Sequence, residues 1–120
     1  MAGNAVSLVS SADSYVRQDA AGTNYGTAVL MDVGSMKDGG TSKNRRSFVE
    51  FDVSSIPASS TVSSATLTLC ATAVPGVTRT YDVHAVSADW VETTITWTNQ
   101  PSVAFQTYDW SLRCSVRPPV

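Results

Sequence analysis

The sequence predicts an all-β fold, either a β-sandwich or a barrel built from short strands. Serine, threonine and valine recur along the whole chain, while charged residues make up only 15% of its 120 residues. That composition is typical of β-rich proteins. Short alternating segments also follow one another at nearly even spacing, with glycine, proline and serine between them. No stretch has a convincing helical period, so we expect no helical layer.

Length and charge limit the classes of protein to consider. With 120 residues there is room for one core, so we expect a single β-sandwich domain over residues 1–120, with residues 1–3 as an added start. The net charge of −2 argues against nucleic acid as a partner, because phosphate binding needs surplus cations over a whole face. No apolar run approaches the length of a membrane span, and we expect no membrane insertion.

The first third of the chain contains three short segments with strand character. We predict strands at Asn4–Val9 and Leu30–Ser35, and a short extended piece around Tyr15 and Val16. The stretch AAGTNYGT, residues 20–27, has the glycine and asparagine content of a loop. Lys37–Asn44, with its paired glycines, is predicted to be a long loop that leads into the next strand.

The segment NRRSFVEFDVSSIP, residues 44–57, is the central strand of the prediction. Its odd positions Val49, Phe51 and Val53 are apolar and its even positions carry mostly charged side chains, the period of a strand with one face on a core. Phe48 breaks this alternation. A large aromatic side chain on the polar face is either covered by another part of the chain or offered to a ligand.

The second half of the chain predicts further strands. SATLTLC, residues 64–70, alternates most cleanly, and TRTYDVHAV, residues 78–86, has a similar pattern. Between Trp90 and Pro101 a β-branched run separates two tryptophans. Alternation predicts one core that contains Val49, Phe51, Leu67, Leu69 and Trp97.

The cysteines and the histidine give little sign of a metal or catalytic site. Cys70 and Cys114 lie far apart without CxxC spacing, so a disulfide between them is conceivable, but a zinc site is not suggested. The single histidine, His84, excludes a multi-histidine metal site and makes a Ser-His-Asp triad improbable.

Five motifs taken in order, DSYVRQ, NYG, NRRSFVEFD, SATLTL and DWVETTITWTNQP, resemble the DNRLRE-domain family over about residues 6–101. That family is similar to jelly-roll carbohydrate-binding modules. The resemblance implies a jelly-roll-like antiparallel β-sandwich, an extracellular or cell-surface location as a secreted domain, and a polysaccharide ligand. Residues 102–120 depart from the family pattern, which implies that the sandwich is incomplete at its C-terminal end.

Basic residues concentrate just before and within the central strand. Lys37, Lys43, Arg45 and Arg46 fall within ten positions of a slightly acidic chain. Guanidinium groups match carboxylates with two parallel hydrogen bonds, so this cluster favours a uronic-acid polymer such as alginate over a neutral glucan. The alternative is a solvated basic loop, balanced by neighbouring carboxylates.

Aromatic residues are the second group of candidate ligand contacts. Tyr25, in the glycine-rich loop, is a candidate sugar contact, or else a tyrosine folded over the end of the sandwich. Phe48 joins this group if it is exposed. Trp90 and Trp97 have the apolar faces on which a pyranose ring stacks, but the parity of Trp97 favours the core.

Two further kinds of site depend on carboxylates. By analogy with other jelly rolls, Asp13, Asp19 and Asp32 are candidate ligands of a structural calcium, although the dense spacing of a calcium loop is missing; otherwise no cofactor is expected. For catalysis, the carboxylates near strands are those of Glu50, Asp52 and Glu92. Neighbouring arginines should keep the first two ionised, which does not suit a general acid, so we predict no enzyme activity.

The sequence thus predicts a non-catalytic module that binds an acidic extracellular polysaccharide. The alternative is a structural or adhesive cell-surface domain that mediates assembly. If strands are missing after Pro101, a sheet edge is left without a partner. We expect the β-prone segment Phe105–Val116 to join two copies as a homo-oligomer, because a single short strand within the chain is too little to replace the missing ones. The alternative is a complete, smaller monomeric sandwich whose tail packs on its own edge.

Overall fold

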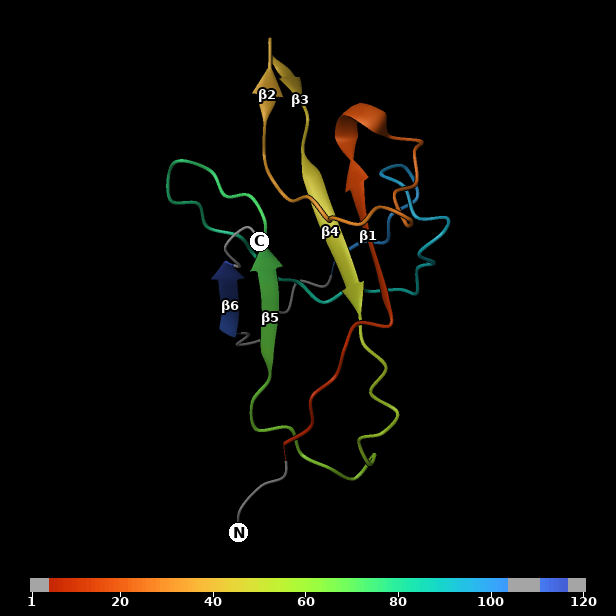
Figure 1. Ribbon diagram of the computed structural model, residues 1–120. Coiled ribbons are helices and arrows are strands. Elements are labelled where there is room, and N and C mark those ends of the chain that lie inside the picture. The colour runs from red at the N-terminus through yellow and green to blue at the C-terminus, as the bar shows by residue number, and fades with distance from the viewer. Residues whose placement is uncertain (1–4, 104–110, 117–120) are drawn as a thin grey trace. The chain divides into compact units, whose positions relative to one another are not determined.

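The computed structural model describes residues 5–103 and the backbone of residues 111–116 (Figure 1). Six strands and one turn of 3-10 helix make up its regular structure. They are β1 (Ala12–Arg17), η1 (Gln18–Ala20), β2 (Lys37–Asp38), β3 (Thr41–Ser42), β4 (Arg45–Glu50), β5 (Thr66–Ala71) and β6 (Ser111–Val116). The all-β prediction is confirmed, and the antiparallel pairs are consistent with a β-sandwich-like fold.

The contacts divide the chain into two compact units. The first contains residues 1–58 and 88–102, and the second contains residues 59–87 and 103–120. In the first unit β1 and β4 pair antiparallel, as the adjacent orange and yellow arrows of Figure 1 show. Burial alternates along β1, where Ser14 and Val16 are buried and their neighbours are not, as expected for a strand with one face on a core.

The core of the first unit lies on one face of the β1–β4 pair. Val16 is fully buried and Phe48 is 5% exposed. Ser14, which lies opposite Phe48 in the register, is buried beside them. Ile95, from the turn-rich segment of residues 88–102, is 2% exposed. The predicted parity of the central strand is therefore wrong, because an even-numbered residue of β4 carries its most buried side chain.

The position of Phe51 also differs from the prediction. β4 ends at Glu50, Phe51 is only partly buried, and Val53 is exposed. The even face of β4 looked polar because Arg46 and Glu50 are exposed residues near and at its ends, where long charged side chains extend into water beside a buried centre.

β2 and β3 form a tight hairpin where a long loop was predicted. Lys37 pairs with Ser42 and Asp38 with Thr41, so only Gly39 and Gly40 form the turn. Their φ angles are +56° and +87°. A two-residue hairpin of this kind needs positive φ at both positions, which glycine adopts without strain. The paired glycines were therefore the signal for a hairpin.

Three predicted strands do not form. Residues 5–9 of the predicted strand Asn4–Val9 have no strand structure, and within Leu30–Ser35 only Gly34 forms a bridge, to Arg45. In the predicted strand of residues 78–86 only Val86 forms a bridge, to Val103.

The second unit contains a sheet that the sequence predicted in part. β5 coincides with the cleanest alternating segment, and its half-buried residues are Leu67, Leu69 and Ala71. β6 pairs with β5 over six residues, from Thr66 opposite Ser111 to Ala71 opposite Val116 (Figure 1). The pairing is parallel, so the expectation of purely antiparallel sheets is corrected.

Residues 111–116 therefore pair within the chain, which was the alternative to the predicted self-association. The remainder of the predicted tail strand, residues 105–110, is outside the described residues. Self-association remains an untested prediction. Cys70 is exposed and free, while the side chain of Cys114 is not among those described. No helix in the described part of the chain has the length and apolar character that a membrane crossing requires.

Candidate functional site

The β1–β4 pair has two chemically different faces. Side chains alternate along each strand, and Arg17 lies opposite Arg45 in the register while Val16 lies opposite Arg46. One face, which we call the covered face, carries the buried side chains and packs against residues 88–102; it is formed by Ser14, Val16, Arg46 and Phe48. The other, which we call the polar face, is formed by Tyr15, Arg17, Arg45 and Ser47.

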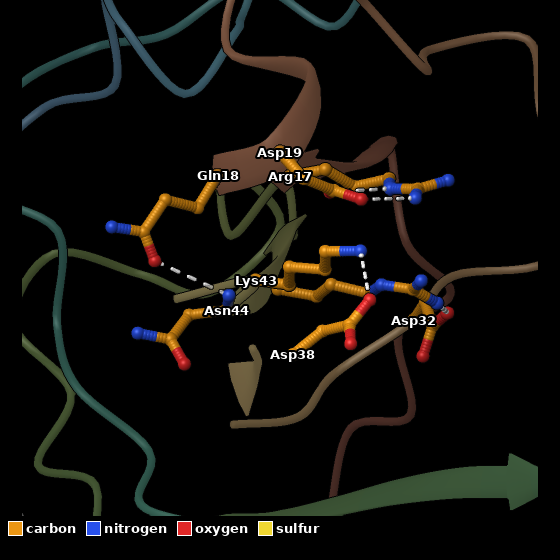
Figure 2. Close-up of polar contacts among 8 residues, drawn as sticks. Arg17, Gln18, Asp19, Asp32, Asp38, Lys43 and Asn44 are labelled. Atoms are coloured by element: carbon orange, nitrogen blue, oxygen red, sulfur yellow. Dashed lines mark hydrogen bonds and ion pairs between the residues drawn. The ribbon is translucent and has the colours of Figure 1, made fainter. Parts of the chain in front are cut away.

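Arg17 is fixed on the polar face by a forked ion pair. Its Nε donates to Oδ1 of Asp19 at 3.0 Å and its Nη2 donates to Oδ2 at 2.7 Å (Figure 2). The 3-10 turn that follows β1 places Asp19 two residues beyond Arg17, within reach of this fork. These hydrogen bonds raise the pKa of Arg17 and lower the pKa of Asp19, and the nearby charge of Arg45 lowers the latter further. Both groups stay charged, and 28% of the Arg17 side chain is exposed.

Two tyrosines form a stack beside Arg17. The rings of Tyr15 and Tyr25 are 4.4 Å apart between centroids, with 20° between their planes. The guanidinium carbon of Arg17 lies 6.0 Å from the centre of the Tyr25 ring. Tyr25 is half-buried. It is thus both a tyrosine folded onto the sheet and a neighbour of a partly exposed cation.

The loop that carries Tyr25 is held by the segment of residues 88–102. The side-chain amide of Asn24 donates to the carbonyl oxygens of Glu92 and Ile95, both at 2.8 Å, and its Oδ1 accepts from the Gly26 amide at 3.0 Å. A Cβ atom at Gly26 would lie 2.0 Å from the Glu92 carbonyl oxygen. Only glycine permits this approach, so the motif NYG fixes the position of Tyr25.

The predicted basic residues divide between the two faces. Lys43 donates to Asp38 at 2.9 Å (Figure 2). Arg45 forms an ion pair with Asp32. In Figure 2 the end groups of Arg17 and Lys43 are directed to the same side. Lys37 is exposed on the hairpin that precedes them. Lys37, Lys43 and Arg45 therefore belong to one end of the sheet together with Arg17.

Arg46 lies on the covered face. Its guanidinium carbon is 5.0 Å from the centre of the Trp97 ring, and its Nη1 donates to the side-chain oxygen of Gln100 at 3.1 Å. Because successive strand residues point to opposite faces, Arg45 and Arg46 do not act on the same ligand surface. Trp97 is half-buried beneath this cation.

Phe48 is a core residue, and its inclusion among the candidate ligand contacts is corrected. Its ring packs edge to face with Trp90, at 5.7 Å between centroids and 61° between planes. The covered alternative considered for this ring is the one observed, because Trp90 and its neighbours close over the covered face. The run between Trp90 and Pro101 consists of turns and not of a strand.

The predicted calcium ligands do not gather into a metal site. Across the described residues, no group of three or more histidine, cysteine or acidic residues is placed to hold a metal ion. Asp19 and Asp32 are paired with arginines, and the backbone amide of Asp13 donates to Oε1 of Glu92 at 2.9 Å. Glu92 thus binds a backbone amide of β1 that does not pair with β4.

The other carboxylates considered for catalysis have structural explanations. The backbone amide of Ser54 donates to Asp52 at 2.9 Å and lowers the pKa of this carboxyl group. The Asp52 pKa is lowered, as predicted, but the cause is the hydrogen bonding from Ser54 and not a neighbouring arginine. Glu50 is exposed at the end of β4.

The sequence analysis did not single out Arg17 and Tyr15, which share the polar face with Arg45. They lie in the motif DSYVRQ, which was used only for the family resemblance. Their alternation along β1 places both on one face, and this signal was present in the sequence.

Comparison with known proteins agrees with a carbohydrate-binding class. No curated protein and no solved structure matches the chain. The family model of carbohydrate-binding module family 96 matches residues 4–114, which is most of the chain. Such modules are generally non-catalytic. The protein therefore belongs to carbohydrate-binding module family 96.

Proposed function

We propose that the chain is a non-catalytic module that binds an acidic extracellular polysaccharide, such as alginate, at the basic end of the polar face. The observation that carries this proposal is the arrangement of partly exposed cations around one edge of the sheet. The end groups of Arg17 and Lys43 extend to the same side in Figure 2. Lys37 lies on the hairpin just before Lys43, and Tyr25 lies beside Arg17.

Ion pairs orient the Arg17 and Lys43 side chains, but these pairs use only some of their N–H donors. A guanidinium group carries five N–H donors, and two of those on Arg17 point to Asp19. An ammonium group carries three donors, and Lys43 uses one for Asp38. The remaining donors have no partner among the residues that the structure describes. We expect them to bind the carboxylates of a uronic-acid chain, and the ion pairs reduce the entropy lost when those side chains are ordered.

The net charge around these cations is small. We therefore expect the positions of the hydrogen-bond donors to affect ligand binding more than the long-range electrostatic field. Four cations, Lys37, Lys43, Arg45 and Arg17, are accompanied by three carboxylates, which leaves one positive charge. The Arg45 side chain is 21% exposed and is paired with Asp32, so we expect it to contribute less to ligand binding than Arg17 and Lys43. We therefore expect retention by acidic polymers to weaken with added salt, but with a shallow dependence.

Affinity electrophoresis through gels that contain alginate, pectate, xylan or soluble cellulose tests this proposal, with and without a chelator. We expect retention by the acidic polymers, independent of the chelator. Arg17→Ala and Lys43→Ala should each weaken retention by roughly 1 kcal/mol, about five-fold in the dissociation constant, the upper range for an exposed charge pair.

Two control variants make the assignment specific. Arg79→Ala removes an exposed arginine in the second unit and should leave retention unchanged. Arg46→Ala removes a cation from the covered face and should have a smaller effect than Arg45→Ala. Equal losses for Arg17→Ala and Arg79→Ala would rule out the polar face as the site, and stronger retention by xylan than by alginate would rule out the acidic ligand.

A further inference from the structure

The segment of residues 88–102 forms an open depression above the covered face. Its cavity volume is about 210 Å³, and it is lined by Asp89, Trp90, Val91, Thr94, Ile95 and Asn99. Ligand pockets for larger molecules measure roughly 300–1,000 Å³, so this depression has the size for a small ring. It is separate from the cations of the polar face, because the two lie against opposite faces of the β1–β4 pair.

Hydrogen bonds within the segment hold the floor of the depression in place. The amides of Thr94 and Ile95 donate to the Val91 carbonyl oxygen at 3.1 and 2.9 Å. Asn99 accepts from the Thr96 amide at 2.7 Å and donates to the Thr94 carbonyl at 2.9 Å. These turns hold Val91, Thr94, Ile95 and Asn99 in place.

Several polar groups in the lining remain unused. The Asp89 carboxylate and the Thr94 hydroxyl form no hydrogen bond or ion pair within the part of the chain that the structure describes. The side-chain amide of Asn99 has a second N–H beyond the one that binds Thr94. An acceptor, a hydroxyl and a donor are thus available around one aromatic wall.

The aromatic wall is Trp90, and the core supports it. Its indole packs edge to face on Phe48, which is 5% exposed. Phe48 is therefore a positioning residue that restricts the indole. A restricted ring loses less entropy when a ligand packs on it.

We propose that this depression binds one neutral sugar residue. A pyranose ring has an apolar C–H face that packs on an indole and hydroxyl groups around its rim. The Asp89 carboxylate accepts hydrogen bonds from hydroxyls, while Asn99 and Thr94 complete the donor and acceptor set. The negative charge of Asp89 repels a uronate, so this site selects neutral residues.

The site extends beyond the proposed function, because it takes a different class of sugar. The module then has two sites, one for acidic and one for neutral residues, on opposite faces of the same strand pair. It would hold a polymer of mixed composition or two separate chains.

Titration of the full chain with methyl glycosides tests this proposal. The probes are methyl glucoside, galactoside, mannoside and xyloside, with methyl glucuronide as the charged counterpart, and the readout is the assigned indole N–H signal of Trp90. We expect a saturable shift with at least one neutral glycoside. Asp89→Ala should weaken it about ten-fold, as for loss of a hydrogen bond to a charged group.

Asp89→Asn supplies the sharpest comparison. It keeps the shape of the side chain but removes the charge, so the preference for a neutral glycoside over the glucuronide should disappear. Asp82→Asn, at an exposed residue in the second unit, should change nothing. Retention by alginate should survive Asp89→Ala, so failure of this site and failure of the acidic site are distinguishable.

Three results would overturn the proposal. One is the absence of any saturable shift of the Trp90 signal with the neutral glycosides. Another is unchanged affinity in Asp89→Ala. The third is a glucuronide that binds the wild-type depression as tightly as the neutral glycosides do.

Discussion

Alanine in place of Phe48 tests which face of β4 is buried. Phe48 is 5% exposed and packs on Trp90, so the substitution removes a nearly complete ring from the covered face. Loss of a buried phenylalanine lowers the free energy of unfolding by about 3 to 5 kcal/mol. Small domains have about 5 to 15 kcal/mol in total, so this variant should lose a large part of its stability.

Phe51→Ala is the matched control, because it removes the same atoms three residues further on. Phe51 is only partly buried and follows the end of β4, so we expect a loss of about 1 to 2 kcal/mol. Urea unfolding followed by tryptophan fluorescence measures both variants, and Phe48→Leu should fall between Phe48→Ala and the wild type. A larger loss for Phe51→Ala than for Phe48→Ala would show that the assigned parity is wrong.

Three further predictions follow from other features. Gly26→Ala should lower the unfolding free energy by about 1 to 3 kcal/mol, because its Cβ would meet the Glu92 carbonyl oxygen, whereas Gly22→Ala, with open space around it, should be neutral in the same urea titration. Because its ion pair lowers the pKa of Asp19, the stability from this pair is present above the ordinary aspartate pKa of about 3.9 and is lost as pH falls through the lower folded value. Asp19→Asn should flatten that part of an acid titration followed by circular dichroism, and an unchanged profile would contradict it. If the chain self-associates through Phe105–Val116, light scattering over a dilution series should give a mass above that of the monomer, which deletion of the residues after 106 should abolish; a monomer mass at every concentration would refute this.

The sequence predicted the strands that have both alternation and a partner. β4 and β5 lie in segments recognised by their period of two, and β1 lies where a short extended piece was predicted around Tyr15 and Val16. The predicted strand at residues 78–86 has similar alternation, yet Tyr81 is 40% exposed and only Val86 forms a bridge. A period of two describes a pleated strand but not the partner that stabilises it, so alternation alone was insufficient here.

The run after Trp90 shows a different limit. Its threonines and isoleucine favour strands, but Thr96 and Asn99 exchange hydrogen bonds between side chains and backbone amides. Such local bonds give the backbone partners outside a sheet, and they outweighed the β propensity of the branched residues. The turns that result carry Trp90 and line the depression, so the depression could not be predicted from strand periods.

The sequence predicted the arrangement of the basic residues only in part. Lys37, Lys43 and Arg45 lie at one end of the sheet, while Arg46 points to the other face. The error came from counting charges along the sequence, although the alternation of the strand already separates neighbouring residues. Arg17 comes from a strand 28 positions earlier, and only the β1–β4 register places it opposite Arg45.

The first unit consists of two separate stretches, residues 1–58 and 88–102, so its parts leave the ribosome at different times. The sheet formed by β1 and β4 can pair early, but Trp90 and Ile95, which close over it, are synthesised only after residues 59–87. At about 5 to 20 residues per second, this delay lasts roughly 1.5 to 6 seconds. During that interval Val16 and Phe48 lack their cover, and the nascent chain presents an apolar strand pair to chaperones or to other chains.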